Sequence, residues 1–378
     1  GAGIGGMAAA IALSRNGWPV VLLEKHKITS EEGAGIQIGP NGTRILQYLK
    51  ITPHLYDLIA QPQGIRIMDG VTGANLTYLP LVQNVIQKYE APYWVLHRAD
   101  LHSALRSVLE KEKRINFLTG AEVVHAANEE GGICVNLRDG RIVRGTALIG
   151  ADGLWSTVRE QIFKTSHLGF CGKCALRAVI PSDKLPLGIS VTETTLWLRP
   201  FSHIVHYPIR GGQEVAIVAI FNEGRQSETW AGSIDLETVS SRITTFPPLL
   251  QELLLRPFQW RKWSIYTLEK SGPWVEGRIA LLGDAAHPML PFLAQGAVMA
   301  LEDAMILANL LQGKDPSEIS DILIIYEQIR RNRVTRVQQA SAQNGTIYHL
   351  AGISRLARNI ALRLVPSSII LSRYDWLY

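Results

Sequence analysis

The first six residues, Gly-Ala-Gly-Ile-Gly-Gly, limit the possible folds of this chain more than any other segment. Glycines at positions 1, 3 and 6 have the G-x-G-x-x-G spacing, and a helix-forming run and the apolar run VVLLE follow them. In this pattern Gly1 makes a tight turn, Gly3 lets the backbone approach a pyrophosphate, and Gly6 lets a helix pack closely on a strand. The free N–H groups at the helix start attract the anion. Glu24, which ends the apolar run, is near the spacing expected of a ribose-binding carboxylate.

These features predict a doubly wound α/β unit that binds a dinucleotide. A β-strand normally precedes the glycine turn, but the sequence starts at Gly1. We therefore expect the first strand to be absent and the chain to be a fragment.

Composition narrows the class of protein. The chain has 378 residues, 47% of them hydrophobic, and a formal net charge of +5, so it is long enough for more than one core. Lys and Arg are scattered and are not interleaved with aromatic residues in one run, which favours a solvated basic surface over a nucleic-acid groove. No apolar stretch reaches the roughly 18 residues of a membrane span, so we expect none.

The three cysteines, Cys134, Cys171 and Cys174, indicate a reducing compartment and hence the cytoplasm. Cys171 and Cys174 form a C-x-x-C. The surrounding residues GFCGKCALRAVI read as a turn that enters a strand, whereas a redox motif needs a helix start. No second pair or nearby histidine completes a zinc site. We therefore expect ordinary thiols and no bound metal.

Apolar periodicity divides the chain into helical and strand-rich segments. Helices are expected over 40–61, over 97–114 and from 295 onward. Strands are expected as hairpins over 64–97, as a β-meander over 115–153, throughout 171–225 and over 260–268. Within the last helical part, four arginines gather on one expected helix: Arg330, Arg331, Arg333 and Arg336. We expect them to be solvated or to face a second subunit.

Two further segments bring an aspartate to the end of an apolar strand. In ALIGADGLWSTVR the strand leads into Asp152, and Ser156 can cap the helix that follows. In GRIALLGDAAHPMLPFLAQGAVMALEDA the strand leads into Asp284, and a turn at Gly296 opens a long helix. An aspartate at a strand end can accept a hydrogen bond from a ribose hydroxyl. A helix N-terminus can stabilise a developing negative charge.

With these segments the sequence resembles the group A flavoprotein aromatic monooxygenases, the family of p-hydroxybenzoate hydroxylase. It looks most like the salicylate hydroxylase and 3-hydroxybenzoate 6-hydroxylase branch. The resemblance runs over nearly the whole chain and is specific for the family but not for the substrate. Its carriers are GAGIGG (1–6), GAGIQIGPN (33–41), HRADL (97–101), GADGLWSTVR (150–159), HIVHYPIRGG (203–212) and GDAAHPMLPFLAQGAVMALEDA (283–304).

The resemblance implies an α/β fold in which a Rossmann-like FAD-binding domain is interleaved with a β-sheet substrate domain and followed by a C-terminal helical segment. We expect the FAD-binding domain over 1–65, 95–170 and 265–320. The substrate domain is expected over 66–94 and 171–264, and the C-terminal helices over 321–378.

FAD is the implied bound cofactor. The implied contacts are Gly1, Gly3, Ile4 and Gly6 around the pyrophosphate, Glu24 with Lys25 at the adenosine ribose, Ala34, Gly35 and Ile36 along the flavin, Arg98 at the phosphates, Val123 at the adenine, Asp152 in a motif linked to FAD and to the nicotinamide, Asp284 at the ribityl or pyrophosphate portion, and Gly296 with Ala297 at the flavin pyrimidine ring.

The implied reaction is hydroxylation of a small phenolic or hydroxylated heteroaromatic acid. NAD(P)H reduces the flavin, O₂ forms a flavin hydroperoxide, and an electron-rich ring attacks its distal oxygen. The partners are therefore the aromatic substrate and O₂, and a homodimer is one possible assembly. A phenolate is a better nucleophile than a phenol, so a general base should lie near the substrate hydroxyl.

His203 and Tyr207 are the candidates for catalysis. They lie four apart in HIVHYPI, so a regular strand turns them to the same face. In the 3-hydroxybenzoate 6-hydroxylase type of enzyme a His and a Tyr at this spacing contact the substrate phenol. The resemblance implies His203 as the base and Tyr207 as the group that orients the hydroxyl, with packed strand residues as the alternative. His206 faces the other way and is expected to be structural.

Other positions are candidates for substrate contact. Arg177 could pair with a substrate carboxylate, although a structural salt bridge is the alternative. His287, in GDAAHP, is expected to pack behind the site. At Pro291 and Phe292 related enzymes often have Gln, His or Tyr. Phe292 cannot accept a proton, which shifts the base role to His203 and makes the pocket more apolar.

Other readings of the same motifs stay open. An FAD epoxidase or a polyketide hydroxylase shares them, and a flavin-binding protein without oxygenase activity is a further alternative. A plain NAD-dependent dehydrogenase is disfavoured because it would not need the Asp152 and Asp284 segments. The sequence leaves open which ring and which carbon is hydroxylated, and whether NADH or NADPH is the reductant.

Overall fold

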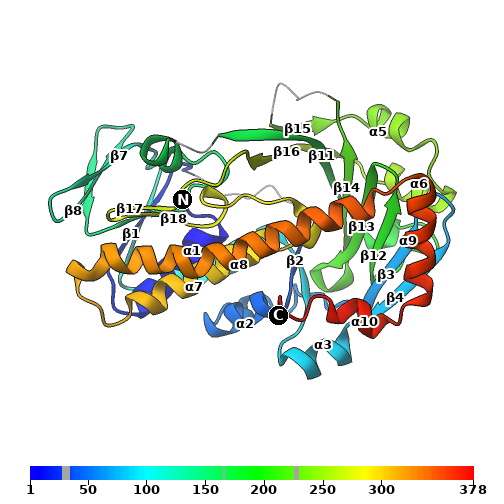
Figure 1. Cartoon of the computed structure of the whole chain (residues 1–378), viewed down its shortest axis with the longest axis horizontal. Coiled ribbons are helices and arrows are strands. Elements are labelled where there is room, and N and C mark those ends of the chain that lie inside the picture. The colour runs from blue at the N-terminus through cyan, green and yellow to red at the C-terminus, as the bar shows by residue number, and fades with distance from the viewer. Residues whose placement is uncertain (28–34, 165–166, 225–229) are drawn as a thin grey trace.

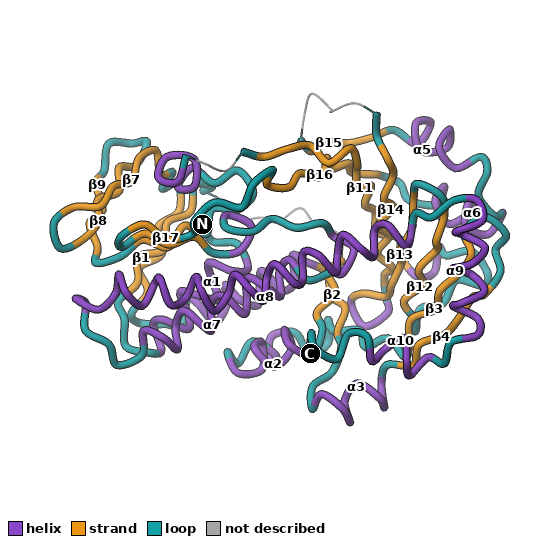
Figure 2. Tube along the Cα trace, in the orientation of Figure 1, coloured by secondary structure: helices purple, strands orange, loops and turns teal. Residues whose placement is uncertain are grey.

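One end of the molecule is built around an eight-stranded sheet (Figures 1 and 2). The computed structural model describes residues 1–27, 35–164, 167–224 and 230–378. The strand order is β15-β16-β11-β14-β13-β12-β3-β4, and neighbouring strands are antiparallel except β12 and β3. The strands are β3 (Gly64–Asp69), β4 (Asn75–Pro80), β11 (Leu168–Pro181), β12 (Thr194–Arg199), β13 (Ser202–Ile209), β14 (Glu214–Asn222), β15 (Ala231–Ile234) and β16 (Trp260–Leu268).

The two faces of this sheet bury different side chains, because successive strand residues point to opposite sides. One face packs against helices α5 (Leu236–Ile243) and α6 (Pro248–Leu255) through side chains such as Ile204 and Ile217. The other face turns toward β5 (Trp94–His97) and the 3₁₀ turn η6 (Pro291–Leu293). The second face carries His203, Tyr207 and Arg177.

The other end of the molecule is a parallel α/β unit. The glycine turn leads directly into α1 (Ile4–Arg15), which packs against α4 (Arg98–Leu109) and α7 (Gly296–Leu311). The small buried alanines of α1 let these helices come close. Strand β1 (Val20–Glu24) pairs in parallel with β6 (Ile115–Thr119), and β10 (Leu148–Gly150) pairs in parallel with β18 (Ile279–Leu281). Strand β17 (Val275–Glu276) pairs antiparallel with β18.

Other elements lie between the two ends or at the outer side of the parallel unit. Strand β2 (Gly35–Ile38) pairs antiparallel with β5. A separate three-stranded sheet consists of β7 (Val123–Glu129), β8 (Gly132–Leu137) and β9 (Ile142–Gly145). The remaining helices of this part are α2 (Pro40–Tyr48) and α3 (Val82–Tyr89).

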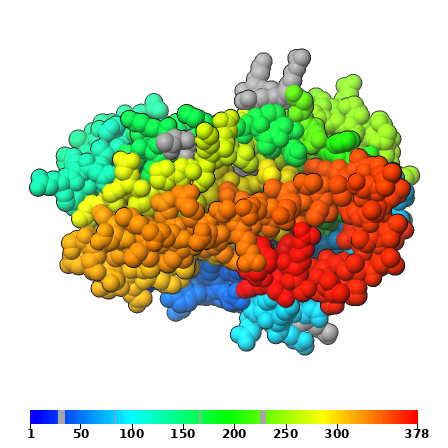
Figure 3. Space-filling model, in the orientation of Figure 1, coloured from blue at the N-terminus to red at the C-terminus, as the bar shows by residue number. Residues whose placement is uncertain are grey.

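The C-terminal helices join both ends. The long helix α8 (Ile319–Tyr348) crosses the face seen in Figure 3, from the parallel unit to the large sheet. Helices α9 (Gly352–Leu364) and α10 (Ser367–Ser372) then pack against β4. No helix in the described ranges is long and apolar enough to cross a membrane.

The α/β fold class is confirmed, but three local predictions are wrong. The helix expected over 40–61 ends at Tyr48, since Lys50 has a positive φ and Pro53 disfavours a continued helix. The hairpin segment contains helix α3. The meander is limited to β7–β9, because β6 and β10 instead pair with strands far away in sequence. Helices α5 and α6 were not predicted.

Candidate active site

The glycine turn has the shape that a dinucleotide needs. Gly3 is the N-cap of α1. It has no side chain, so no side-chain cap accepts hydrogen bonds from the first N–H groups of the helix. A Cβ on Gly6 would lie 2.0 Å from the carbonyl oxygen of Gly1, which only glycine avoids. A Cβ on Gly3 would meet nothing within 4 Å, so this side of the turn is open. Ile4 is buried in the core, and only its backbone is on the helix N-terminus.

Glu24 ties the glycine turn to the end of β1. Its Oε2 accepts a hydrogen bond from the backbone N–H of Ala2 at 2.7 Å, and its Oε1 accepts one from His26 at 2.9 Å. Burial opposes ionisation, but these backbone donors outweigh it and hold the pKa of Glu24 below its usual value. The carboxylate is therefore ionised and fixed. Lys25 beside it is exposed.

The other residues predicted to contact FAD lie in several different elements. Gly35 and Ile36 lie in β2, and Gly35 comes so close to the large sheet that a Cβ there would lie 2.4 Å from the ring of Tyr207. Arg98 begins α4, directly after β5. Val123 begins β7, next to the end of β1. Ala34 lies outside the described residues.

The two predicted aspartates differ in what they bind. Asp152 accepts from the hydroxyl of Ser156 at 2.5 Å and from the backbone N–H of Val158 at 3.1 Å, so both of its oxygens already hold the following turn. Asp284 is exposed, and its Oδ1 lies 4.0 Å from where a Cβ on Gly296 would be. The buried Arg159 donates to the carbonyls of Leu154 and Ala285, and it thereby connects the two aspartate loops.

The N-terminus of α7 faces Asp284. Its N-cap, Gln295, makes no side-chain cap, so Gly296 and Ala297 present backbone N–H groups at the positive end of a 16-residue helix. Two uncapped helix starts, a glycine-only contact at Gly6 and an exposed carboxylate at Asp284 fit a dinucleotide cofactor with a flavin ring.

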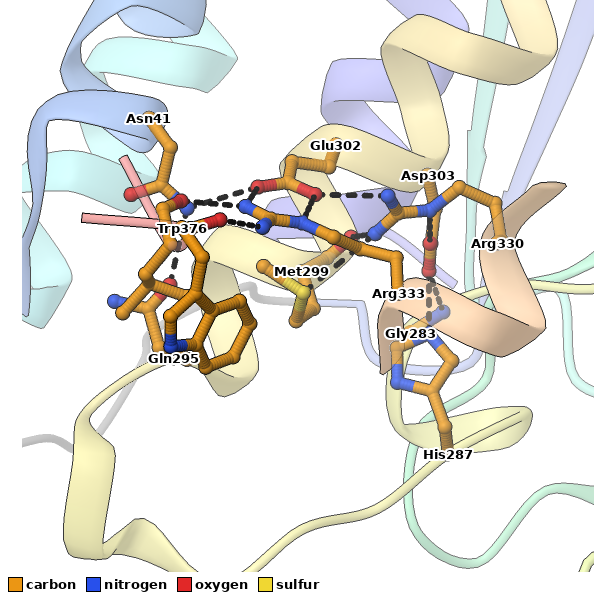
Figure 4. Close-up of polar contacts among 11 residues, drawn as sticks. Asn41, Gly283, His287, Gln295, Met299, Glu302, Asp303, Arg330, Arg333 and Trp376 are labelled. Atoms are coloured by element: carbon orange, nitrogen blue, oxygen red, sulfur yellow. Dashed lines mark hydrogen bonds and ion pairs between the residues drawn. The ribbon is translucent and has the colours of Figure 1, made fainter. Parts of the chain in front are cut away.

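A buried ion network supports this region from behind (Figure 4). Asp303 of α7 accepts from Arg330 Nε at 2.7 Å, from His287 Nε2 at 2.6 Å and from the backbone N–H of Gly283 at 3.0 Å. Burial alone would raise the pKa of Asp303, but His287 and Arg330 lower it to about 2. The network fixes the loop that carries Asp284 against α7, and it gives His287 the packing role expected of it.

The prediction that the four arginines of α8 are solvated or face a second subunit is wrong for Arg330 and Arg333, whereas Arg336 is exposed. Arg330 is 3% exposed and pairs with Asp303 and Glu302. Arg333 pairs with Glu302 and donates to the carbonyls of Trp376 and Leu377, as Figure 4 shows in part. The other two act within the chain as well. Arg331 binds Glu327 and lies over Trp274, and Arg336 lies over Trp376. Carboxylates of α7 and backbone carbonyls of the C-terminal segment hold Arg330 and Arg333 against the protein.

His203, Tyr207 and Arg177 lie on one face of the large sheet. In β13 the register pairs His203 with Ile220 and Tyr207 with Ala216, and both partners pack on the face toward β5 and η6. Arg177 of β11 pairs with Val218, which shares that face. His206 points to the opposite face and is 1% exposed.

His203 is a neutral imidazole at the edge of an aromatic group. Its Nδ1 lies 2.8 Å from Nε2 of His349, the residue that ends α8. The rings of Phe292 and Tyr348 lie 5.3 Å and 5.2 Å away. Burial, His349 and Lys173 lower the pKa of His203 well below its usual value. The ring is therefore neutral near neutral pH, and one of its two nitrogens keeps a free lone pair.

Tyr207 and Arg177 form a second, cationic group. Burial raises the pKa of Tyr207, and the neighbouring Arg177 opposes that shift. Burial lowers the pKa of Arg177, and the positive charge of Arg98 lowers it further. Arg177 lies over the ring of Trp263, and its buried Nε has no hydrogen-bond partner among the described residues. In the same ranges no carboxylate pairs with Arg177, so the structural salt bridge is not found there.

Phe292 fits a notch in α8 and Pro291 starts the turn that carries it. A Cβ on Gly345 would lie 2.4 Å from the ring of Phe292. Phe292 therefore forms an apolar wall beside His203. Sequence reasoning missed His349 and Arg159. Arg159 lay within a recognised motif, whereas nothing in the sequence connects His349 to a residue so far away.

The cysteines and possible metal ligands add no further site. Cys171 and Cys174 lie in β11 at an irregularity in its register with β16, and the described cysteines are unpaired. Across the described ranges, no group of His, Cys, Asp or Glu could hold a metal ion.

Comparison with known proteins gives one consistent family. Residues 1–341 match the family model described as FAD binding domain. The 3-hydroxybenzoate 6-hydroxylase of Polaromonas naphthalenivorans is 34% identical over 100% of this chain and 94% of its own length. That of Klebsiella oxytoca is 33% identical over 100% and 95%. The 3-amino-4-hydroxybenzoate 2-monooxygenase of Streptomyces platensis is 31% identical over 100% and 94%.

Solved structures show the same fold. A substrate complex of salicylate hydroxylase has a TM-score of 0.84 at 23% identity and covers 100% of this chain and 93% of its own. HpxO of Klebsiella pneumoniae, complexed with FAD and uric acid, has a TM-score of 0.85 at 24% identity and covers 99% and 94%.

Proposed function

Because this chain belongs to the family of FAD-dependent aromatic monooxygenases, we propose that it hydroxylates a small aromatic acid bearing both a phenolic hydroxyl and a carboxylate. The family binds FAD and usually takes its reducing equivalents from NAD(P)H. The relatives that are at least 30% identical act on hydroxybenzoates, according to their names. A hydroxylated heteroaromatic acid is the neighbouring substrate class, since a solved relative holds uric acid.

The observation that carries the proposal is the pairing of a neutral base with a buried cation on one sheet face. His203 and Tyr207 are four residues apart, so their Cα atoms are about 13 Å apart along the strand. One small hydroxyl group cannot reach both side chains at that separation. A ring whose substituents lie at its two ends can reach both groups.

We therefore infer that the substrate hydroxyl faces His203 and that the carboxylate faces Arg177 and Tyr207. This changes the role of Tyr207, which then orients the carboxylate. An Arg–carboxylate hydrogen bond in a buried site is among the stronger polar contacts. Arg177 suits it because its Nε has no partner among the described residues. Phe292 closes the side of the ring near His203 and helps to exclude water.

His203 would accept the phenol proton on Nε2 while its Nδ1 is engaged with His349. For Nε2 to accept, Nδ1 must carry the hydrogen and donate it to His349. His349 therefore acts as a positioning residue that selects the tautomer. Because His349 is only partly buried, the proton can then pass outward. When bound and reduced, FAD supplies the activation of O₂ that inserts one oxygen atom into the ring.

For the cofactor we propose the residues that the sequence predicted. Gly1, Gly3 and Gly6 would surround the pyrophosphate, with Ile4 contributing backbone only, and Glu24 would receive the ribose. Asp284 with the α7 N-terminus at Gly296 and Ala297 would hold the ribityl chain and the pyrimidine ring. The other members of this set are Lys25, Ala34, Gly35, Ile36, Arg98, Val123 and Asp152.

Three further proposals concern the domains, the location and the assembly of the protein. The division into an FAD-binding domain, a substrate domain and C-terminal helices follows which strands share a sheet. A cytoplasmic location rests on the unpaired thiols. A homodimer rests on the resemblance to the family, and the exposed aliphatic side chains of α9, such as Ile353 and Leu364, support it.

The test uses the purified full-length protein. It should be yellow with flavin absorbance, and NADH or NADPH consumption should rise with one member of a panel of salicylate, hydroxybenzoates, hydroxynicotinates and urate. Mass spectrometry with isotopically labelled O₂ should then find one labelled oxygen in the product. A flavin-loaded protein that oxidises NAD(P)H without forming a labelled product from any panel member would overturn the proposal.

A further inference from the structure

The buried side chain of Asn41 joins helix α2 to the beginning of α7. Its Nδ2 donates to Oε1 of Gln295 at 3.1 Å and to Oε1 of Glu302 at 2.8 Å. Gln295 is the N-cap of α7 and directly precedes Gly296. Asn41 is 6% exposed and Gln295 3%, so water competes little for these hydrogen bonds. A single amide therefore fixes the turn from which α7 starts, as Figure 4 shows.

The position of α2 also determines where strand β2 ends. Gly39 is the only residue between β2 and α2, and Pro40 starts α2 with a fixed φ angle. Two of the proposed flavin contacts, Gly35 and Ile36, lie in β2. The N-terminus of α7 carries the proposed contacts to the flavin pyrimidine ring. Asn41 therefore connects the two elements that we propose to flank the flavin.

Close packing beside Asn41 holds the two helices together. A Cβ on Gly42 would lie 3.0 Å from a methyl group of Val298 in α7 and 2.7 Å from one of Ile38. The helices thus meet at a glycine where no side chain has room. Since this contact does not involve the amide of Asn41, it remains in a variant that lacks the amide.

Glu302 keeps the amide of Asn41 in place. Its carboxylate also binds Arg330 Nη1 at 2.8 Å and Arg333 Nη2 at 2.9 Å. Burial would raise the pKa of Glu302, but Arg333 and Arg330 lower it below its usual value. Arg333 is held in turn by the carbonyl of Trp376 at 2.7 Å. The acceptor is therefore ionised and fixed, which makes its hydrogen bond to Asn41 stronger than one between neutral groups.

We propose that Asn41 is a positioning residue for the flavin, which holds Gln295 so that the N–H groups of Gly296 and Ala297 meet the pyrimidine ring. This rests on the proposed function, in which those N–H groups contact that ring. The pyrimidine ring of bound FAD gains negative charge on reduction, and N–H groups at a helix start stabilise negative charge. They contribute most when they are fixed beforehand. A loosened start of α7 therefore disfavours reduced FAD more than oxidised FAD.

The experiment measures the midpoint potential of FAD bound to full-length Asn41→Leu, which removes the amide and keeps a side chain of similar size. The affinity for reduced FAD should fall about tenfold more than that for oxidised FAD, which lowers the two-electron potential by about 30 mV. Asn16→Leu is the matched control, because Asn16 donates its amide at 2.7 Å to the carbonyl of Ala308, toward the other end of α7. It should keep the wild-type potential. Melting temperatures of both variants measure any general loss of stability.

A second pair of variants decides the question if Asn41→Leu loses its FAD. Arg333→Met weakens the hold on Glu302 and should lower the potential in the same direction. Arg331→Met removes the same charge from the same helix, where Arg331 binds Glu327, and should leave the potential unchanged. A wild-type potential in FAD-loaded Asn41→Leu would overturn the proposal, as would an equal shift in Asn16→Leu. If only the second pair retains FAD, equal potentials in Arg333→Met and Arg331→Met would overturn it.

These outcomes are separate from those that test hydroxylation, because the potential is measured without an aromatic substrate. A lowered potential in Asn41→Leu, together with a wild type that hydroxylates no panel member, would refute only the proposed reaction. A wild type that hydroxylates one panel member, with an unchanged potential in Asn41→Leu, would refute only the positioning role of Asn41.

Discussion

The imidazole rings of His203 and His349 are joined by a 2.8 Å contact between Nδ1 and Nε2, although 146 residues separate them in the chain. One histidine is on a strand of the large sheet, and the other ends the long helix α8. Their contact connects the proposed base to a residue that reaches the surface. Several expected outcomes rest on this pair and on the residues around it.

Replacement of His203 by Ala should lower the rate of hydroxylation by roughly 10²–10⁴-fold, the usual contribution of a general base. FAD content should not change, since no proposed cofactor contact is lost. Single-turnover product formation and flavin absorbance measure the two effects. Equal rates in the variant and the wild type would remove His203 from the mechanism.

His349→Ala should lower kcat by about tenfold and leave KM nearly unchanged, because the tautomer of His203 is lost but the substrate contacts remain. His349→Gln can still accept a hydrogen bond and should recover part of the rate. A merely structural residue would not show this rescue. Equal kcat values for His349→Ala and His349→Gln would contradict the positioning role of His349.

Arg177→Met should raise KM for the carboxylate-bearing substrate by about 10- to 100-fold, the effect of losing one charge-assisted hydrogen bond. The corresponding phenol without a carboxylate should react equally poorly with both proteins. Steady-state kinetics on the two compounds makes the comparison. If Arg177→Met weakens both substrates alike, Arg177 is not the carboxylate ligand.

Gly3→Ala should weaken FAD binding without unfolding the protein, since the added Cβ has open space in the protein but faces the proposed pyrophosphate. Gly224→Ala is the control, because a Cβ there also meets nothing within 4 Å. Flavin release during dialysis and the melting temperature of the apoprotein distinguish affinity from stability. Equal FAD retention in the two variants would count against the predicted cradle.

His206 should make the protein less stable in mild acid. Burial lowers its pKa to about 4 from an ordinary 6.5, so below pH 6.5 the unfolded state binds a proton that the folded state does not. The loss should be about 2 kcal/mol between pH 7 and pH 5. His206→Phe should remove that part of the pH dependence. Urea unfolding of the wild type and of His206→Phe at pH 7 and pH 5 measures the free energy of unfolding. An equal loss of stability in both proteins would contradict the role of His206.

Much of the fold followed from local patterns. The glycine turn and α1, the strand at 260–268, the strands after 171 and the C-terminal helices were all visible as periodicity and as turn residues. The end of α2 was missed because two weak signals, at Lys50 and Pro53, compete with continuing helical periodicity. The partner of β6 was missed because a strand's own residues do not specify whether it pairs with a neighbour or with a distant strand.

Parts of the candidate site could also be predicted from local sequence. The residues proposed to bind the cofactor lie in continuous motifs. A turn followed by a helix can bind phosphate through its own backbone, so a short segment contains all of that geometry. The same holds for the shared face of His203 and Tyr207, which strand alternation alone predicts.

Only the tertiary structure decided which charges are buried and which side chains meet. It turned Arg330 and Arg333 inward to Asp303 and Glu302, brought His349 to His203, left Arg177 without a carboxylate among the described residues, and turned the apolar side of α9 outward. Each of these depends on where distant segments pack, because burial and ion pairing are set by neighbours in space. The sequence by itself determined the family and predicted the glycine turn that we propose for the cofactor, since both depend on short continuous motifs.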